Sequence, residues 1–128
     1  MPHAAVTVPA LGRRFVQALA AKDPHTLSAV LHPAIDFRAL TPNRAWEAQD
    51  RDAVLDILLG DWFPPDAALD ELLLLETDTV ADRQQLRFRF RGRNRDGPMI
   101  VEQQAYIADR DGLIGWMRLV CSGQRAPI

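Results

Sequence analysis

Hydrophobic residues in the first half of the chain recur every three or four positions, which is the period of an amphipathic helix. The stretch from Val8 to Ala21 carries one such apolar stripe, so we predict a helix there. The pair Asp23-Pro24 has the form of a cap and first turn, and it predicts a second helix that ends at His32 because Pro33 follows. A third stripe, from Arg51 to Phe63, precedes two prolines and predicts a third helix.

The second half of the chain changes to a period of two. Residues Gln84 to Arg93 alternate strictly between apolar side chains and arginines, as a strand with one buried face does. We predict further strands at Ile35–Leu40, Glu71–Val80, Pro98–Ala108 and Leu113–Ser122. Turn sequences that end in Gly97 and Gly112 join the last three strands into a meander. The order predicts an α+β class, with three N-terminal helices packed on a curved antiparallel sheet in a single domain, 1–128.

The alternating strand places five arginines between Leu86 and Asp96, which raises the question of polyanion binding. The whole sequence, however, has 17 acidic and 15 basic residues and a net charge of −2. A duplex-binding protein carries a basic excess, because it must displace counterions from phosphates. We therefore interpret the arginines as a solvated face or a subunit contact, and we expect no nucleic-acid partner.

Other site chemistries are limited by residue types. Cys121 is the single cysteine, so no intrachain disulfide or cysteine cluster can form. No pair of histidines or carboxylates has metal-ligand spacing, so we expect neither a metal nor a cofactor. The first residues lack the pattern of a secretory leader, and the apolar runs are too short to span a bilayer. We expect a cytoplasmic protein without a membrane partner.

Two stretches, FVQALAAKDPHTLSAVLHPAIDFRALTP and DGLIGWMRLVCSG, together with the order of elements, resemble the nuclear transport factor 2-like superfamily. That group includes ketosteroid isomerase and the SnoaL-like polyketide cyclases, and the resemblance covers nearly the whole chain. It implies a cone-shaped α+β barrel, a deep apolar pocket for a small molecule, and a homodimer formed through the sheet. The positions that match the isomerase's catalytic Tyr and two Asp are Phe15, Ala39 and Gln104, so we do not expect a ketosteroid isomerase.

Strand register decides which polar groups face that pocket. A three-residue loop, Arg95–Gly97, would place Glu102, Gln104 and Tyr106 on the inner side. Their partners there would be Phe90, Phe88 and Leu86, respectively. A slip of one residue would turn the polar set outward. We adopt the first register, which agrees with the isomerase-like alignment.

In that register, Glu102 is predicted to be the acid/base, because aromatic surroundings raise the pKa of a carboxyl group. Tyr106 would donate to a developing oxyanion, and Gln104 would hold a substrate oxygen. The alternative places Glu102 on the convex face, paired with Arg91 or Arg118.

The remaining candidates for ligand binding are mostly aromatic or apolar. They are Phe15, His32, Phe37, Arg44, Trp46, Trp62, Phe88, Phe90, Met117, Leu119 and Cys121. Three of them have competing interpretations. His32 could cap its helix, Trp46 could belong to a lid, a dimer contact or the core, and Cys121 could be a buried small hydrophobe.

The sequence thus predicts a pocket protein that performs cofactor-independent acid/base chemistry, namely isomerisation, cyclisation or dehydration, on a small apolar oxygenated molecule. One alternative is a non-catalytic binder that uses the same pocket. Another is a dimerising interaction protein whose convex face carries Met99, Val101 and Ile107.

Overall fold

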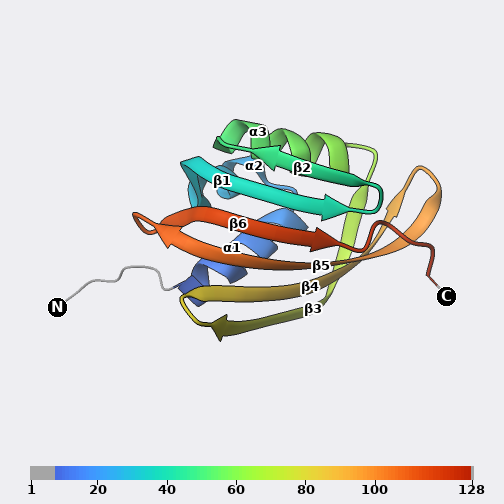
Figure 1. The fold of residues 1–128 in the computed structure, drawn as a ribbon. Coiled ribbons are helices and arrows are strands. Elements are labelled where there is room, and N and C mark those ends of the chain that lie inside the picture. Colours follow the sequence, from blue (N-terminus) through green and yellow to red (C-terminus); the bar gives the residue numbers. More distant parts are fainter. Residues whose placement is uncertain (1–7, 128) are drawn as a thin grey trace.

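The computed structural model describes residues 8–127, which form helices on one face of a six-stranded sheet (Figure 1). In chain order the elements are α1 (Val8–Ala20), α2 (Pro24–Val30), β1 (Leu31–Thr41), β2 (Arg44–Ala48), α3 (Arg51–Asp56), the π-helix η1 (Ile57–Trp62), β3 (Ala68–Val80), β4 (Arg83–Asn94), β5 (Gly97–Arg110) and β6 (Leu113–Cys121). The predicted α+β class is confirmed.

The strand order across the sheet is β2-β1-β6-β5-β4-β3. Every neighbouring pair is antiparallel except β1 and β6, which run parallel. The expectation of a purely antiparallel sheet was therefore wrong. The chain leaves β1 by the short β2 hairpin, and the meander then brings β6 back beside β1 in the same direction.

Local chemistry sets the helix boundaries. The Asp23 carboxylate accepts hydrogen bonds from the backbone N–H of His25 (3.0 Å) and Thr26 (3.2 Å), which caps α2. This helix ends at Val30, two residues before the predicted boundary, because Leu31 already pairs with β6. The predicted third helix is α-helical only to Asp56, after which η1 continues it with a wider turn.

The β4–β5 hairpin corrects the predicted register. Asn94 pairs with Gly97, so the turn has two residues, and Phe90 lies opposite Val101 instead of Glu102. This is the one-residue slip that turns Glu102, Gln104 and Tyr106 outward. The physical reason is the pattern of β5 itself, whose other face offers four apolar side chains for burial. They are Met99, Val101, Ala105 and Ile107.

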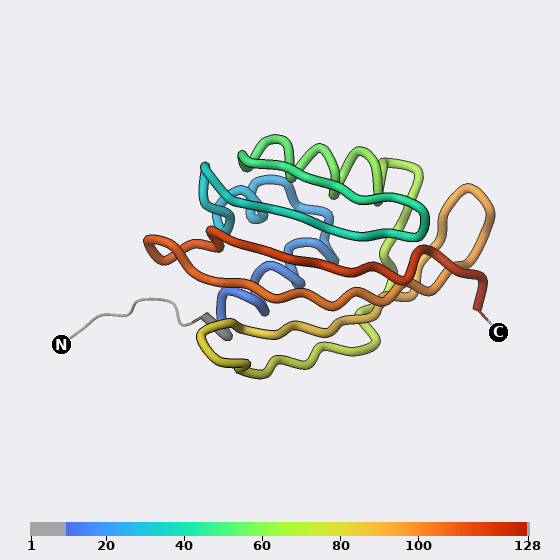
Figure 2. The backbone as a smooth tube through the Cα atoms, viewed as in Figure 1, coloured from blue at the N-terminus to red at the C-terminus, as the bar shows by residue number. Residues whose placement is uncertain are grey.

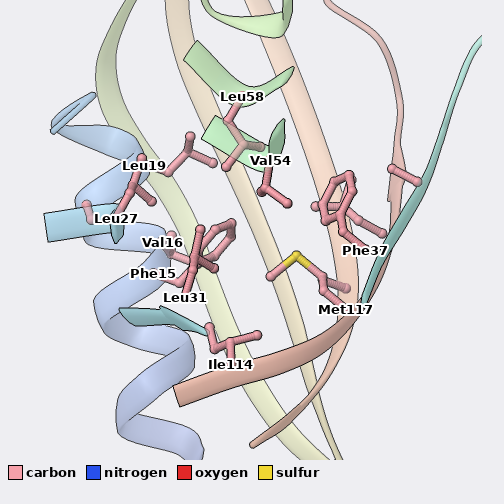
Figure 3. Packing of buried hydrophobic residues seen from close by; sticks show 14 of the residues in the cluster. Phe15, Val16, Leu19, Leu27, Leu31, Phe37, Val54, Leu58, Ile114 and Met117 are labelled. Atoms are coloured by element: carbon pink, nitrogen blue, oxygen red, sulfur yellow. The ribbon is translucent and has the colours of Figure 1, made fainter. Parts of the chain in front are cut away.

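Side chains from the helices and from the inner face of the sheet make one hydrophobic cluster. Figure 3 shows residues of α1, α2 and α3 meeting Phe37, Ile114 and Met117 of the sheet. Met99, Val101 and Ile107 belong to this cluster, so their expected place on the convex face was wrong. After η1 the chain crosses from the β2 side of the sheet to the β3 side, as the tube in Figure 2 shows.

The outer face of the sheet, opposite the helices, carries the arginines of β4. Arg87 and Arg89 both bind Glu102, while Arg91 binds Glu71. Arg93 continues the series with a bond to Asp70 at 3.0 Å. The predicted solvent-facing side of this strand is therefore confirmed. The positive charge there is matched by carboxylates of β3 and β5.

Candidate functional site

One end of the inner face opens to solvent through a pocket of about 240 Å³, which we call the end pocket. Its wall consists of Thr41, Asp61, Trp62, Phe63, Val101, Cys121, Gly123 and Gln124. These residues come from the last turn of η1 and the residue after it, the ends of β1 and β6, β5, and the segment that follows β6. Figure 1 shows that the β1–β2 turn, the β4–β5 hairpin and the C-terminal segment lie at this end of the sheet.

Directly behind this wall lies a buried amide, Gln103. The side chain is 1% exposed and belongs to the inner face, between Val101 and Ala105 of the same strand. Neither its Oε1 nor its Nε2 has a hydrogen-bond partner within residues 8–127. A buried polar group without a protein partner is rare and carries a desolvation penalty, so this amide needs an explanation.

The π-helix η1 positions the aromatic side of the pocket. Its last residue, Trp62, contacts the rings of Phe37 and Trp46 at centroid distances of 6.2 and 5.9 Å. The indole N–H of Trp62 is also buried without a partner in the described structure. Turns of π-helix occur often at functional sites, because the extra residue redirects a side chain. Here the turn brings a second unpartnered donor to the same pocket.

The rest of the wall supplies three groups capable of chemistry. Asp61 contributes a carboxylate at the solvent side of the pocket, and Cys121 contributes a half-buried thiol. The hydroxyl oxygen of Thr41 accepts a hydrogen bond from the Trp46 indole at 2.8 Å. Cys121 is the cross-strand partner of Gln103, so the thiol and the amide are neighbours on the inner face.

The expected catalytic pair lies on the other side of the sheet. The Glu102 carboxylate is held by Arg89 at 2.9 Å and by Arg87 at 3.2 Å on the outer face. Burial raises the pKa of Glu102, but the hydrogen bonds and charges of the two arginines outweigh that effect and leave the pKa below its ordinary value. The predicted upward shift was therefore wrong. Tyr106 and Gln104 are exposed on the same outer face.

The other predicted site residues fall into three groups. Six are buried in the hydrophobic cluster, namely Phe15, Phe37, Phe88, Phe90, Met117 and Leu119. Trp62 and Cys121 line the end pocket, and Trp46 packs beside them. Arg44 is exposed, with its guanidinium 3.6 Å from the centre of the Trp46 ring.

His32 stands apart from this site. It lies in β1 at the end opposite Thr41, and its Nε2 is 3.2 Å from a carboxylate oxygen of Asp111. The C-cap of α2 is Leu31, so the expected capping position of His32 was wrong.

Among the larger hollows, two exceed 500 Å³. One of about 600 Å³ borders β3 and β4, and its charged residues Arg87 and Glu76 bind each other. The other, the outer groove of about 520 Å³, crosses β1, β6 and β5 on the outer face. Its exposed apolar side chains are Leu40, Tyr106 and Val120. We place the candidate ligand site in the end pocket, because the Trp62 indole belongs to its wall and Gln103 lies beside two wall residues, Val101 and Cys121. The third described side chain with a buried unpartnered atom, Arg51, borders a separate hollow.

Within residues 8–127, no three His, Cys, Asp or Glu side chains gather as a metal site would require. No helix in this part of the chain is long and apolar enough to cross a membrane.

Sequence reasoning missed Gln103, Asp61 and Thr41 as site residues. Gln103 could have been found from the odd-numbered residues between Met99 and Ile107 of β5, where it is the one polar residue among apolar ones. Asp61 gave no such signal, because its direction depends on the π-helical turn.

No protein-family model matches the chain, and no curated protein sequence matches it. Solved structures do match. A provisionally named isomerase of Rhodopseudomonas palustris is 16% identical, with a TM-score of 0.71 over 96% of this chain and 93% of that one. A provisionally named polyketide cyclase of Xanthomonas campestris pv. campestris is 14% identical, with a TM-score of 0.68 over 88% and 87%. An LEH-like epoxide hydrolase of M. tuberculosis is 11% identical, with a TM-score of 0.65 over 88% and 80%.

At these identities the likeness concerns the fold. The chain shares the α+β fold of these three structures, as the resemblance led us to expect. One fold hosts many reactions, so this likeness does not give the function.

Proposed function

We propose that the protein binds a small, largely apolar, oxygen-bearing molecule in the end pocket. The observation that supports this most strongly is the buried Gln103 amide, which has no partner within the described chain. Apolar walls around a few convergent polar groups are the usual composition of a ligand site. Phe63, Val101 and Trp62 supply the apolar wall, and the Trp62 indole supplies a polar group. In this proposal the Gln103 amide, which lies beside the wall residues Val101 and Cys121, supplies the second.

The energetic argument compares Gln103 with an apolar residue of the same shape. An unsatisfied buried amide costs roughly 1–3 kcal/mol of folding free energy, whereas an apolar side chain there would avoid that cost. A protein that keeps a destabilising group in its core commonly does so for function. A ligand oxygen or N–H that bonds to the amide would recover the loss on binding.

The test is a protein-observed NMR screen with neutral, oxygenated ring compounds of a size that fits the end pocket. We expect shifts at the Trp62 indole, Val101, Cys121 and the Gln103 side chain. Binding by a Gln103→Met variant should be at least ten-fold weaker. The matched control is Gln104→Met, which removes the neighbouring amide from the outer face and should bind as the wild type does. Shifts centred on the outer groove would contradict the proposal.

A second candidate function is cofactor-independent acid/base chemistry on the bound molecule. The observation that favours it is the Asp61 carboxylate, which η1 places in the wall of the end pocket. Some structures of this fold carry the names isomerase, polyketide cyclase and epoxide hydrolase. In this proposal Asp61 takes the acid/base role that the sequence assigned to Glu102.

This candidate makes a separate prediction. Asp61→Asn should lower turnover of an identified ligand by about 10²–10⁴-fold, the usual contribution of a general acid or base. Its affinity for that ligand should change only a few-fold, because the amide of Gln103 remains. Mass spectrometry of the product measures turnover, and a binding titration measures affinity, so the two effects of the substitution are separated. Turnover that survives in Asp61→Asn would remove the carboxylate from the mechanism.

We also propose that the outer groove is the contact between two copies of the chain. Leu40 and Val120 are 55% and 57% exposed and neighbour each other on β1 and β6. A contiguous exposed apolar patch of this kind marks an interaction surface. The ion pairs Arg38–Glu47 and Arg118–Asp36 lie beside it and supply a polar rim.

A further inference from the structure

We infer that the molecule in the end pocket carries a neutral amide edge, as in a lactam or a primary carboxamide, and pairs it with the Gln103 side chain. This inference rests on the proposed binding function and adds the chemical class of the ligand. The observation behind it is that both ends of the Gln103 amide are unpartnered, not only one.

A glutamine amide offers an acceptor, Oε1, and a donor, Nε2, side by side. One ligand group satisfies both only if it also has a donor and an acceptor side by side. A lactam, with its cis N–H and C=O, has this edge, and so has a primary carboxamide. Ethers, ketones and lactones have acceptors alone, so they would leave Oε1 of Gln103 without a partner.

The surroundings of Gln103 favour a neutral group over a charged one. Its neighbours on β5 are Val101 and Ala105, and its cross-strand partners are Phe88 and Cys121. Val101, Ala105 and Phe88 are apolar, and Cys121 belongs to the wall of the end pocket. A carboxylate or ammonium group next to the amide would be buried without a counter-charge, which costs far more than burying a neutral amide.

The inner face also provides small side chains next to the amide. Val101, in the pocket wall, and Gln103 are two residues apart on β5, which is about 7 Å along a strand. Ala105, on the far side of Gln103, and Ala39 both flank Leu119 and are buried. The residues that flank the amide on β5, Val101 and Ala105, are therefore smaller than the phenylalanines of β4, and the proposed pairing requires the ring to reach Gln103 past Cys121.

The Trp62 indole adds a second requirement. Its N–H is a donor only, and it is buried without a partner in the described structure. The lactam oxygen has two lone pairs, so it can accept from Nε2 of Gln103 and leave a site for a second donor. A ligand with one further acceptor, such as a ring carbonyl or ether, would satisfy the indole independently.

The experiment compares four ring compounds of nearly equal shape: 4-phenylpyrrolidin-2-one, its N-methyl derivative, the corresponding lactone and 3-phenylcyclopentanone. Dissociation constants are measured by NMR titration of the full chain. We expect the lactam to bind at least ten-fold more tightly than the other three, because only the lactam pairs with both ends of Gln103. In Gln103→Met this preference should disappear, whereas Gln104→Met should keep it.

The outcomes separate this inference from the proposed function. If all four compounds bind the end pocket with similar affinity, the proposed binding function is supported and the amide inference is overturned. If the lactam preference persists in Gln103→Met, the selectivity arises elsewhere, and the inference is again overturned. If no compound binds the wild type, both the proposed function and the inference are contradicted.

Discussion

Residues 102 and 103 are adjacent on β5, yet their side chains have opposite surroundings. The Glu102 carboxylate lies on the outer face between two arginines, and the Gln103 amide lies in the core without a partner. The strand pleat sends successive side chains to opposite faces, so a register error of one residue exchanges these roles. The candidate chemistry of the pocket therefore depends on a neutral amide and not on a carboxylate of β5.

The pKa of Glu102 should lie below the ordinary glutamate value of about 4.3, because Arg89 and Arg87 stabilise its charged form. A carboxyl group whose pKa is lowered by folding stabilises the protein above its unfolded pKa. That contribution is lost as the pH falls through the lowered value. A ¹³C NMR titration of the carboxyl carbon measures the pKa directly. Arg89→Gln should raise it, while Arg38→Gln, whose partner is Glu47, should leave it unchanged. A value above 4.3 in the wild type would restore the acid/base interpretation of Glu102.

Lys22, the single lysine, ties α1 to the loop that follows η1. Its ammonium group donates to the carbonyl oxygens of Pro64 at 2.6 Å and Ala67 at 2.5 Å. Lys22→Met should lower the free energy of unfolding by roughly 1–3 kcal/mol, because two charge-assisted hydrogen bonds are lost. Chemical denaturation measures the change. Arg14→Met removes an exposed positive charge from α1 and should change stability by less than about 0.5 kcal/mol. If both substitutions lowered the free energy of unfolding equally, the effect would come from the lost positive charge and not from the two hydrogen bonds of Lys22.

At the scale of elements, alanine substitutions of two glycines, one in η1 and one in β4, should change the stability of the protein in opposite directions. A Cβ on Gly60 of η1 would meet nothing within 4 Å, whereas a Cβ on Gly92 of β4 would collide with the carbonyl oxygen of Ala68. Gly60→Ala should therefore stabilise the protein by about 0.4–1 kcal/mol, by restricting the unfolded chain. Gly92→Ala should destabilise it by about 1–3 kcal/mol, because the β3–β4 pairing must shift. Thermal and denaturant unfolding of the two variants gives both signs. A stable Gly92→Ala protein would contradict the close approach of β3.

The sequence predicted most elements but not the register that joins them. The stripe of α1 and the alternation of β4 were sufficient to predict both elements, because each pattern has a single period. Two- and three-residue turns around Arg95 and Asp96 are both compatible with the same Asn and Gly, so the turn alone did not fix the pairing. The apolar odd-numbered residues of β5 would have fixed it, since burying them excludes burying Glu102.

Two further features of the fold are not local. The short strand β2 forms because Ala45 and Trp46 find partners in β1, and its sequence has no clear period of two. The π-helical turn of η1 likewise depends on tertiary packing, since the sequence of Ile57–Trp62 fits an α-helix equally well. These two elements hold Trp46 and Trp62. The sequence named both tryptophans as candidates, but periodicity could not place their rings in contact.

At the scale of the whole molecule, the helices close one face of the sheet and leave the outer face open. If the outer groove joins two copies, the wild type should have a dimer mass by light scattering at micromolar concentration. Val120→Glu should raise the dimer dissociation constant at least ten-fold, because it buries a charge against apolar side chains. Leu73→Glu is the control, because Leu73 is an exposed leucine of the edge strand β3. A monomeric wild type, or an unchanged Val120→Glu dimer, would contradict the contact.

The central claim is that Gln103 is kept in the core for a ligand and not for the fold. The most direct measurement is the free energy of unfolding of Gln103→Met against the wild type without ligand, by denaturant titration. Met has nearly the shape of Gln and needs no hydrogen bond, so the account predicts that the variant is more stable by about 1–3 kcal/mol. A variant less stable than the wild type by a similar amount would show that the amide stabilises the fold, and it would contradict the claim.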